Sequence, residues 1–248
     1  MANPLAVVMA AGQGTRMESD LPKVLVEVCG RPMIHYVLDA LAKGGIEQVI
    51  VVVGYRADDV RRELAGRDGV FFALQEEQLG TGHAVMACRE FLEPHDGPVL
   101  VVAGDSPMIQ ASSIAKLIEA FGRDHCACLM GTAQKEDPTG LGRVVRDQQG
   151  EFQAIVEEKD ATPQQRQITE VNMTTYVFDC QSLMGALSQL RSDNAQGEYY
   201  VTDCPGILKS EGRNVQALDA LTPGESLSIN NMKELAIVEA EIRRTDSA

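Results

Sequence analysis

The chain has 248 residues, 44% of them hydrophobic, which is enough for one large α/β domain or for one domain with a small lobe. Its formal charge is −14, from 22 lysines and arginines against 36 aspartates and glutamates, and only 4% of its residues are aromatic. These values argue against general binding to nucleic acid or anionic membranes, which needs a basic surface, and against base-stacking platforms for single strands.

The first residues and the cysteines predict a reduced, cytoplasmic protein. "MANP" is not the charged start of a signal peptide, and no apolar run approaches the roughly 20 residues that a membrane span needs. The six cysteines are scattered, and only Cys126 and Cys128 come close to a pair. Because a zinc site usually needs a second such pair, we expect buried thiols that act as small hydrophobic side chains.

The first 134 residues alternate between apolar runs of strand type and runs of helix type. The predicted strands are residues 5–9, 48–54, 69–74, 98–105 and 127–133. The predicted helices are residues 33–43, 57–64, 82–92 and 112–121, the last with Ser112 as its N-terminal cap. This rhythm predicts a parallel sheet with helices on both faces, and in such sheets ligands bind beyond the carboxyl ends of the strands.

After about residue 134 the alternation breaks. We expect two strands joined by a turn at Gly150, a strand at 170–180, helices at 182–190 and 198–212, a strand at 215–220 and a closing helix. Pro205 is expected to interrupt the second of these helices. The pattern indicates a nucleotide-binding lobe over about 1–134 and a smaller mixed lobe over 135–231 on the same sheet, with a helix and tail at 232–248.

A loop of small and cationic residues follows the first strand, in "MAAGQGTRMESDLPK" (9–23). It is neither a P-loop nor a dinucleotide fingerprint, because Lys23 follows a proline and Met17 stands where the third glycine belongs. Arg16 and Lys23 suit a polyphosphate better than a carboxylate, although cations of a surface loop can also be merely solvated. Four small residues allow the backbone to approach a ligand and form an anion nest: Ala10, Ala11, Gly12 and Gly14.

Two further strand ends carry polar residues. Asp105, in the "GDSP" corner after the strand at 98–105, suits Mg²⁺, which takes one or two protein oxygens and completes its shell with water and phosphate. An aspartate that caps a turn is the alternative. "QEEQLGTGHA" (75–84) opens a helix with a glycine-rich turn, where the Gln75 amide could read a base edge and Gly80-Thr81 would allow close approach.

Together these segments resemble the nucleotidyltransferases that join a nucleoside triphosphate to a sugar 1-phosphate. "AAGQGTRMESDLPKVL" is similar to the signature of that family. "LQEEQLGTGHA", "DPTGLGRVVRD", "IVEEKDAT", "NAQGEYYVTD" and "INN" resemble the uridylyltransferase domain of bacterial N-acetylglucosamine-1-phosphate uridylyltransferases. The resemblance covers about residues 5 to 231. It implies a Rossmann-like, glycosyltransferase-A-like fold with a mixed, mostly parallel sheet and a smaller sugar-binding lobe, so that residues 1–231 form the nucleotidyltransferase domain.

The resemblance also implies roles and substrates. The substrates would be UTP and a sugar 1-phosphate, with Mg²⁺ as cofactor and pyrophosphate as the leaving group. The implied sets are Arg16 and Lys23 for catalysis; Ala10, Ala11, Gly12, Gly14, Gln75, Gly80 and Thr81 for the nucleotide; Gly140, Glu157 and Asn172 for the sugar; and Asp105 and Asn230 for the metal. Because the sugar phosphate is already an anionic nucleophile, no general base is needed, and we expect His35 and His83 to be ordinary helix residues.

Two departures from the family pattern limit what the resemblance implies. Full-length bifunctional members of the family carry a C-terminal left-handed β-helix of hexapeptide repeats that acetylates glucosamine 1-phosphate. No such repeats follow Asn231 in this sequence, so we expect neither acetyltransferase activity nor the trimer that the β-helix builds. The family usually has Asn-Thr-Gly where this chain has Asn172-Met173-Thr174. A side chain in place of glycine restricts the backbone beside the sugar pocket. The preferred sugar therefore stays open, as does the oligomeric state.

The sequence leaves three alternatives to transfer onto N-acetylglucosamine 1-phosphate. The first is the same reaction on another hexose 1-phosphate, such as glucose 1-phosphate. The second is a catalytically silent nucleotide-sugar-binding regulator, which would be expected to have lost some of the four residues Arg16, Lys23, Asp105 and Asn230. The third is a molybdenum-cofactor guanylyl- or cytidylyltransferase, whose loop would more often begin with two glycines and which would leave "GEYYVTD" unexplained.

Overall fold

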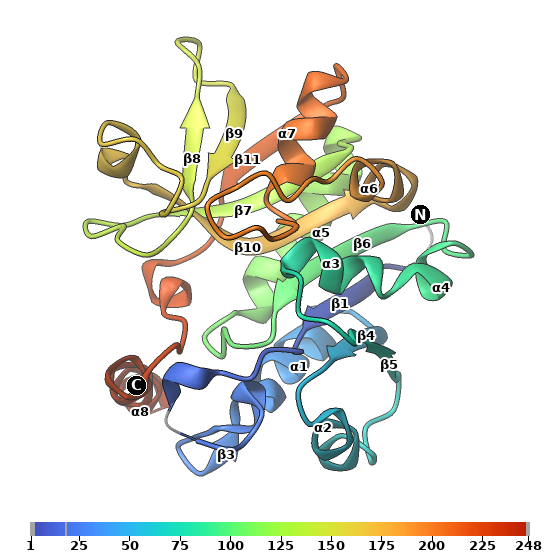
Figure 1. Ribbon diagram of the computed structural model, residues 1–248, viewed down its shortest axis with the longest axis vertical. Helices are drawn as coiled ribbons and strands as arrows, with labels where there is room; N and C mark the ends of the chain where they lie inside the picture. Colours follow the sequence, from blue (N-terminus) through green and yellow to red (C-terminus); the bar gives the residue numbers. More distant parts are fainter. Residues whose placement is uncertain (1–2, 18, 247–248) are drawn as a thin grey trace.

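The computed structural model describes residues 3–17 and 19–246. The predictions made above for residues 1–2, Glu18 and 247–248 lie outside the described residues. Nine strands form one sheet with the path β11-β7-β10-β6-β1-β4-β5, and β8 and β9 are attached to it through β10 (Figure 1). The strands are β1 (Leu5–Met9), β4 (Gln48–Val53), β5 (Val70–Leu74), β6 (Pro98–Ala103), β7 (Cys128–Gln134), β8 (Arg143–Arg146), β9 (Phe152–Val156), β10 (Glu170–Asp179) and β11 (Val215–Asp219). A separate ribbon joins β2 (Glu27–Val28) to β3 (Arg31–Pro32).

The centre of the sheet is parallel. β1 lies between β4 and β6 and runs parallel to both, with Val8 opposite Val51 on one side and Val102 on the other. These three valines are almost completely buried, as expected of strands covered on both faces. β10 runs antiparallel to both β6 and β7, which makes the sheet mixed. The predicted fold class is confirmed.

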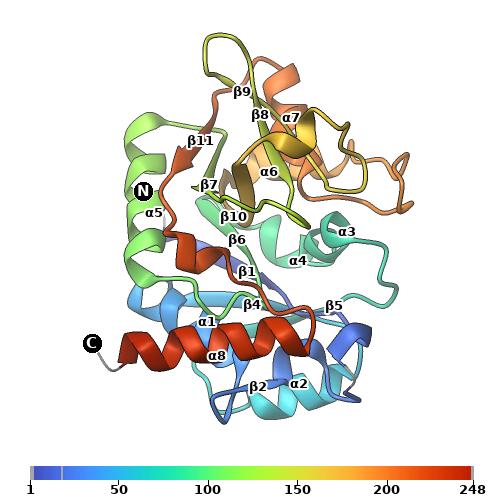
Figure 2. The same cartoon turned by 90° about the vertical axis from the view of Figure 1, so that its left-hand side faces the viewer.

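Helices cover both faces of the sheet, as the sequence predicted. In Figure 2, α5 and α1 lie on one side of the strands and α3, α4 and α6 on the other. The helices are α1 (Met33–Lys43), α2 (Ala57–Glu63), α3 (Thr81–Met86), α4 (Arg89–Leu92), α5 (Ala111–Asp124), α6 (Cys180–Leu187), α7 (Asp203–Ser210) and α8 (Met232–Asp246). Two hydrophobic clusters follow from this arrangement, one on each face of the sheet.

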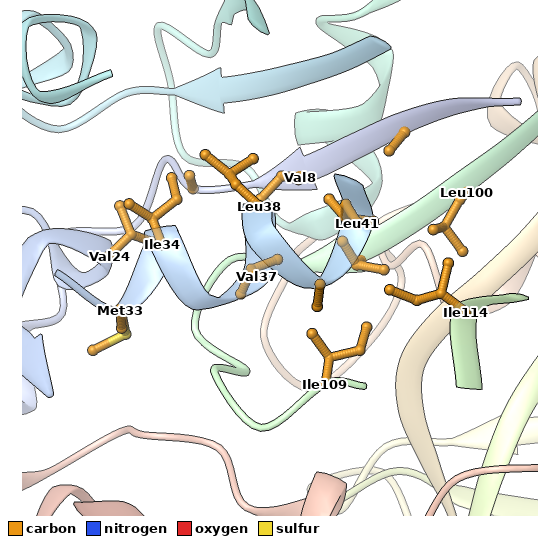
Figure 3. Packing of buried hydrophobic residues seen from close by; sticks show 14 of the residues in the cluster. Val8, Val24, Met33, Ile34, Val37, Leu38, Leu41, Leu100, Ile109 and Ile114 are labelled. Carbon is orange, nitrogen blue, oxygen red and sulfur yellow. The ribbon is translucent and has the colours of Figure 1, made fainter. Parts of the chain in front are cut away.

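The first cluster shows why α1 forms where it does. Met33, Ile34, Val37, Leu38 and Leu41 recur at helical spacing and are 0–2% exposed. In Figure 3, Leu38 lies beside Val8 of β1 and Leu41 lies toward Ile114 of α5, whereas Met33 points away from β1. Full burial of each is worth about 1.5–3 kcal/mol, so the helix is stabilised mainly by its packing on the sheet.

Three local predictions were wrong. Ser112 is not a cap, because α5 begins one residue earlier, at Ala111, and the carboxylate of Glu225 accepts the backbone N–H of Gln110 (2.9 Å) near that end. Pro205 does not interrupt α7, because it lies in the first turn, where its missing N–H has no partner to lose. The helix predicted at 82–92 is broken into α3 and α4.

The cysteines are free thiols, and five of the six are buried, as predicted, whereas Cys29 is half-buried. Burial raises the pKa of Cys88 to about 12, so its thiol stays protonated. Among residues 3–17 and 19–246, no three histidines, cysteines or acidic residues form a group that could hold a metal. No helix in the same ranges is both long enough and apolar enough to span a membrane.

Candidate active site

A cleft of about 380 Å³ lies at the carboxyl ends of β1 and β6. From β1 the sheet order continues to β4 on one side and to β6 on the other, which makes this edge a topological switch point. The three segments singled out in the sequence, after β1, β5 and β6, all line the cleft. Its lining residues are Met9, Ala10, Ala11, Gly12, Lys23, Val24, Gln75, Gln78, Gly80, Thr81, Ala84, Ala103, Asp105, Thr174 and Glu198.

The loop after β1 is held by backbone hydrogen bonds to β4 and to the residues that follow β4. The N–H of Ala10 donates to Val52 (3.0 Å), and the carbonyl of Ala11 accepts from Tyr55 (3.0 Å). The N–H of Ala10 is therefore used inside the sheet, and what this residue offers a ligand is its small side chain. Gly14 has φ +68°, and a Cβ there would lie 2.7 Å from the Cβ of Lys23. Glycine at position 14 thus allows Lys23 to pack across the loop.

Two cationic side chains and two side-chain oxygens meet at one end of the cleft. The ammonium of Lys23 forms an ion pair with Asp105 and donates to Oδ1 of Asn230 at 2.8 Å. Arg16 donates to the same oxygen at 3.4 Å. The side chains of Lys23 and Asp105 are only 13% and 24% exposed, so this ion pair is partly shielded from solvent.

Asn230 lies just before α8 and is oriented by Glu234 in the first turn of that helix. Oε2 of Glu234 accepts from the backbone N–H of Asn230 (2.7 Å) and from its Nδ2 (3.0 Å). The N–H of Ile229 donates to the carbonyl of Asp105 at 3.3 Å. With the amide nitrogen held in this way, Oδ1 of Asn230 faces Lys23. Two oxygens from distant parts of the sequence therefore converge on one cationic group.

This pair of oxygens fits a cation that takes few protein ligands. A carboxylate and an amide oxygen share one ammonium group, so both lie within reach of a single positive charge. Mg²⁺ is a hard cation that binds one or two such oxygens and completes an octahedral shell with water and substrate phosphate. The donor set at Asp105 and Asn230 is consistent with that chemistry.

Gln75 lies at the opposite wall and is 3% exposed. Its Nε2 donates to the carbonyl of Gly80 (3.1 Å) and to Nδ1 of His83 (3.2 Å). Both hydrogens of the amide nitrogen are therefore donated to protein groups. If this side chain contacts the edge of a base, it does so through its oxygen, which accepts a hydrogen bond. His83 was expected to be an ordinary helix residue, and the structure shows that it helps to hold the Gln75 amide.

The segment at 198–201 packs on the turn before α3. The N–H of Gly82 donates to the carbonyl of Tyr199 (2.7 Å), and the N–H of Val201 donates to Oγ1 of Thr81 (3.0 Å). Gly80 has φ +108°, and a Cβ there would lie 2.6 Å from the Tyr199 carbonyl. Only glycine therefore fits at position 80, and the close packing brings Glu198 to the cleft.

The residues predicted to bind the sugar do not line this cleft. Glu157 lines a second cleft of about 300 Å³, in which Asp160 and Asp203 also lie. Burial raises the pKa of the Glu157 carboxyl, as it does for Asp203. The N–H of Gly140 donates to Glu158 at 3.2 Å.

Asn172 lines neither cleft but lies close to a residue of each. It is 4% exposed, and a Cβ built at Gly142 would lie 3.5 Å from the Cβ of Asn172 and 3.6 Å from Oε1 of Glu157. Asn172 and Glu157 therefore approach the same point. Oδ1 of Asn172 accepts the N–H of Thr174 at 3.3 Å, and Thr174 lines the first cleft.

Sequence reasoning missed three polar residues of the first cleft: Gln78, Thr174 and Glu198. Glu198 belongs to "NAQGEYYVTD", which the resemblance had singled out as a segment but not by residue. Thr174 had been noted as a departure from the family pattern, without a place in the cleft. Gln78 carries no signal of its own in the turn after β5.

A profile of the MobA-like NTP transferase domain matches residues 6–200. The chain belongs to this family. Among curated relatives of this NTP transferase domain, the bifunctional protein GlmU of Pelotomaculum thermopropionicum is 47% identical over 239 residues, 96% of this chain and 52% of that protein. The bifunctional protein GlmU of Brevibacillus brevis is 45% identical over 96% of this chain and 51% of its own length. The chain spans about half the length of the curated relatives that it matches.

Solved structures agree with the NTP transferase fold. A Bacillus anthracis structure assigned as a glucose-1-phosphate thymidylyltransferase, in complex with sucrose, superposes with a TM-score of 0.80 at 18% identity, over 97% of this chain and 95% of the other. A UDP-glucose pyrophosphorylase in complex with UDP-glucose gives a TM-score of 0.79 at 14% identity, over 98% and 99%. At these identities the similarity concerns the fold alone.

Proposed function

We propose that this domain transfers the uridylyl group of UTP to N-acetylglucosamine 1-phosphate, giving UDP-N-acetylglucosamine and pyrophosphate. The observation that carries the proposal is the convergence of three strand-end segments on one cleft, with Lys23, Asp105 and Asn230 in contact at its end. Identity of 43–47% to GlmU proteins over 96–98% of this chain supports the uridylyl reading over the other members of the family.

The nucleotide end of the cleft has the chemistry for a triphosphate. Small residues at 10–12 allow the backbone to approach the ribose and phosphates, and Gly14 leaves the room in which Lys23 crosses the loop. Arg16 and Lys23 supply the local positive charge that an anionic ligand requires on a chain with a net charge of −14. The Gln75 oxygen, with Gly80 and Thr81, would accept from the base.

Asp105 and Asn230 would hold Mg²⁺, which when bound supplies charge neutralisation at the phosphates. In the structure both oxygens contact the ammonium of Lys23 instead. Lys23 therefore has to turn toward the phosphates when a metal occupies this position.

The reaction needs positioning and charge stabilisation. A phosphate oxygen of the sugar 1-phosphate forms a bond to the α-phosphorus of UTP, while the bond from that phosphorus to the bridging oxygen breaks and pyrophosphate leaves. The nucleophile arrives deprotonated, so no side chain has to remove a proton. Arg16 and Lys23 would bind the two anions together and stabilise charge on the leaving group.

The sugar would extend from Thr174 in the first cleft toward β8, β9 and β10, where Gly140, Glu157 and Asn172 lie outside that cleft. On this proposal residues 1–134 mainly bind the nucleotide and residues 135–231 mainly bind the sugar, with the helix and tail at 232–248 outside both. Transfer to another hexose 1-phosphate is the second candidate, because Thr174 places a side chain where the family pattern has glycine. A cytoplasmic location is supported by the six free thiols, which persist in reducing compartments.

Pyrophosphate release tests the proposal. The purified chain is mixed with Mg²⁺, UTP and one of a panel of sugar 1-phosphates that includes those of N-acetylglucosamine and glucose. We expect release that depends on UTP, on metal and on sugar phosphate, fastest with N-acetylglucosamine 1-phosphate. Faster release with another sugar would favour the second candidate. No release with any sugar, from protein that binds UTP, would contradict the proposal and favour a regulator.

A further inference from the structure

Thr174 has a backbone conformation that residues of its type avoid. Its φ is +49°, in the left-handed region, where a branched Cβ collides with the neighbouring backbone. Four non-glycine residues in the described ranges have positive φ: Cys29, Arg56, His125 and Thr174. Thr174 is the one among them with a branched Cβ, and it lines the cleft at the carboxyl ends of β1 and β6.

The conformation of Thr174 comes from a bulge in β10. Asn172 pairs with Thr132 and Tyr176 pairs with Met130, so residues 173–175 stand opposite the single residue Gly131 of β7. On the other edge of β10, Thr175 keeps its pairing with Val102 of β6. Bulges of this kind change the direction of a side chain, and they are common beside active sites.

Buried groups hold the bulge in place. The N–H of Thr174 donates to Oδ1 of Asn172 (3.3 Å), and Nδ2 of Asn172 donates to the hydroxyl of Tyr176 (2.6 Å). Oγ1 of Thr175 donates to the carbonyl of Met173 at 3.2 Å. Asn172 is 4% exposed and Tyr176 is fully buried. Surroundings this constrained can maintain a strained residue, and such residues cluster where a ligand is gripped.

Thr174 also links the first cleft to the residues predicted to bind the sugar. It shares the cleft with Lys23 and Asp105. Through Asn172 it is joined to the point that Glu157 also approaches, at Gly142. A molecule that reached from the Lys23–Asp105 pair to Glu157 would pass Thr174.

We infer that Thr174 is the specificity-determining residue for the sugar 1-phosphate, an inference that rests on the proposed function. Its methyl and hydroxyl groups reduce the room beside the phosphate-bearing carbon of the sugar. Side chains that only fill space in a pocket discriminate between substrates by about 10–200-fold per methylene-sized group. A smaller residue at 174 therefore favours bulkier sugars, and a larger one favours smaller sugars.

The test compares Thr174→Gly and Thr174→Asn with the unaltered chain. Both glycine and asparagine tolerate the left-handed conformation, so both keep the bulge. Glycine opens the cleft, whereas asparagine has about the volume of threonine and relieves the strain without opening it. For each protein, kcat/KM is measured with the 1-phosphates of N-acetylglucosamine and of glucose, together with the KM for UTP. We expect the ratio of the first kcat/KM to the second to rise about tenfold in Thr174→Gly and to change less than about twofold in Thr174→Asn. The KM for UTP is expected to change less than about twofold in both variants, since a merely distorted fold would move it too.

His125→Gly is the matched control. His125 is exposed, has φ +48° and ends α5, away from the cleft, so this change also relieves left-handed strain. We expect His125→Gly and Thr174→Gly both to raise the melting temperature, and only Thr174→Gly to change the sugar ratio. An unchanged ratio in Thr174→Gly, or a rise of the same size in Thr174→Asn, would overturn the inference. An unaltered chain that releases no pyrophosphate with any sugar would instead contradict the proposed function.

Discussion

At one end of the cleft, Lys23, Arg16, Asp105 and Asn230 form a group whose side chains satisfy one another, whereas at the other end Thr174 is held in a strained backbone by buried residues. The first end consists of loops that follow buried strands. The second consists of a bulge inside a strand.

The difference matters for what each end can do. On the proposed function, Asp105 and Asn230 at the first end would exchange the ammonium of Lys23 for Mg²⁺. The second end cannot rearrange so easily, since Asn172 and Tyr176 are buried and bonded to each other. We therefore expect charge and metal to act at the first end, and size and shape of the substrate to be read at the second.

Lys23→Ala tests the first end of the cleft and should have the largest effect on turnover. Loss of a charge aimed at the leaving pyrophosphate is expected to lower kcat by about 10²–10³-fold, with the melting temperature little changed. Steady-state turnover with UTP and the preferred sugar phosphate measures this. Lys116→Ala, at an exposed position on α5, is the control and should turn over normally. Near-normal turnover in folded Lys23→Ala would exclude this role.

Asp105→Asn tests the metal at the first end. Loss of the carboxylate charge should raise the Mg²⁺ concentration for half-maximal turnover by at least about tenfold. Calorimetric titration of Mg²⁺ into protein with bound UTP checks the same change without turnover. Asp68→Asn, an exposed aspartate before β5, is the control. A titration identical to that of the unaltered chain would remove Asp105 from the metal site.

Tyr176→Phe sharpens the comparison at the second end. It removes the hydroxyl that accepts from Nδ2 of Asn172 and leaves a buried amide without its partner. We expect the free energy of unfolding to fall by about 1–3 kcal/mol. The KM for the sugar phosphate should rise severalfold, while that for UTP stays constant.

Tyr36→Phe serves as the control for Tyr176→Phe. Its hydroxyl donates to the carbonyl of Val28 at 2.9 Å, remote from the bulge. It should lower stability without changing the KM for the sugar. If both variants leave the KM for the sugar unchanged, the bulge does not position the substrate.

Glu157→Gln gives the smallest expected effect, seen in the pH dependence of stability. Because burial raises the folded pKa of Glu157 above 4.5, the folded state binds its proton more tightly than the unfolded chain does. The contribution of Glu157 to the free energy of unfolding is fully present at pH values below 4.5 and is lost as the pH rises through the folded pKa. Glutamine cannot ionise. The melting temperature of Glu157→Gln minus that of the unaltered chain should therefore increase as the pH rises.

Glu119→Gln, at an exposed position on α5, controls for a general change in net charge. Its difference from the unaltered chain should not follow the same pH course. A constant difference between Glu157→Gln and the unaltered chain at all pH values would show that Glu157 is not buried in an unfavourable environment.

The two ends also differ in how far the sequence predicts them. The strands, the parallel core and the loop at 9–23 could be predicted, because buried strands are continuous apolar runs and the residues that follow them lie at one edge of the sheet. The bulge could not, because it depends on how β10 aligns with β6 and β7, which are distant in the sequence. Ser112 was misjudged for a similar reason, because Glu225, from another part of the chain, contributes to the start of α5. Pro205 was misjudged for a local reason, because it lies in the first turn of α7, which accepts a proline.

The most direct measurement follows the α-phosphate of UTP. UTP labelled at the α-phosphorus is incubated with the chain, Mg²⁺ and N-acetylglucosamine 1-phosphate, and the products are separated. The account predicts that the label appears in UDP-N-acetylglucosamine only when metal and sugar phosphate are both present. Label that stays in UTP, or that appears in UMP through hydrolysis, would contradict it.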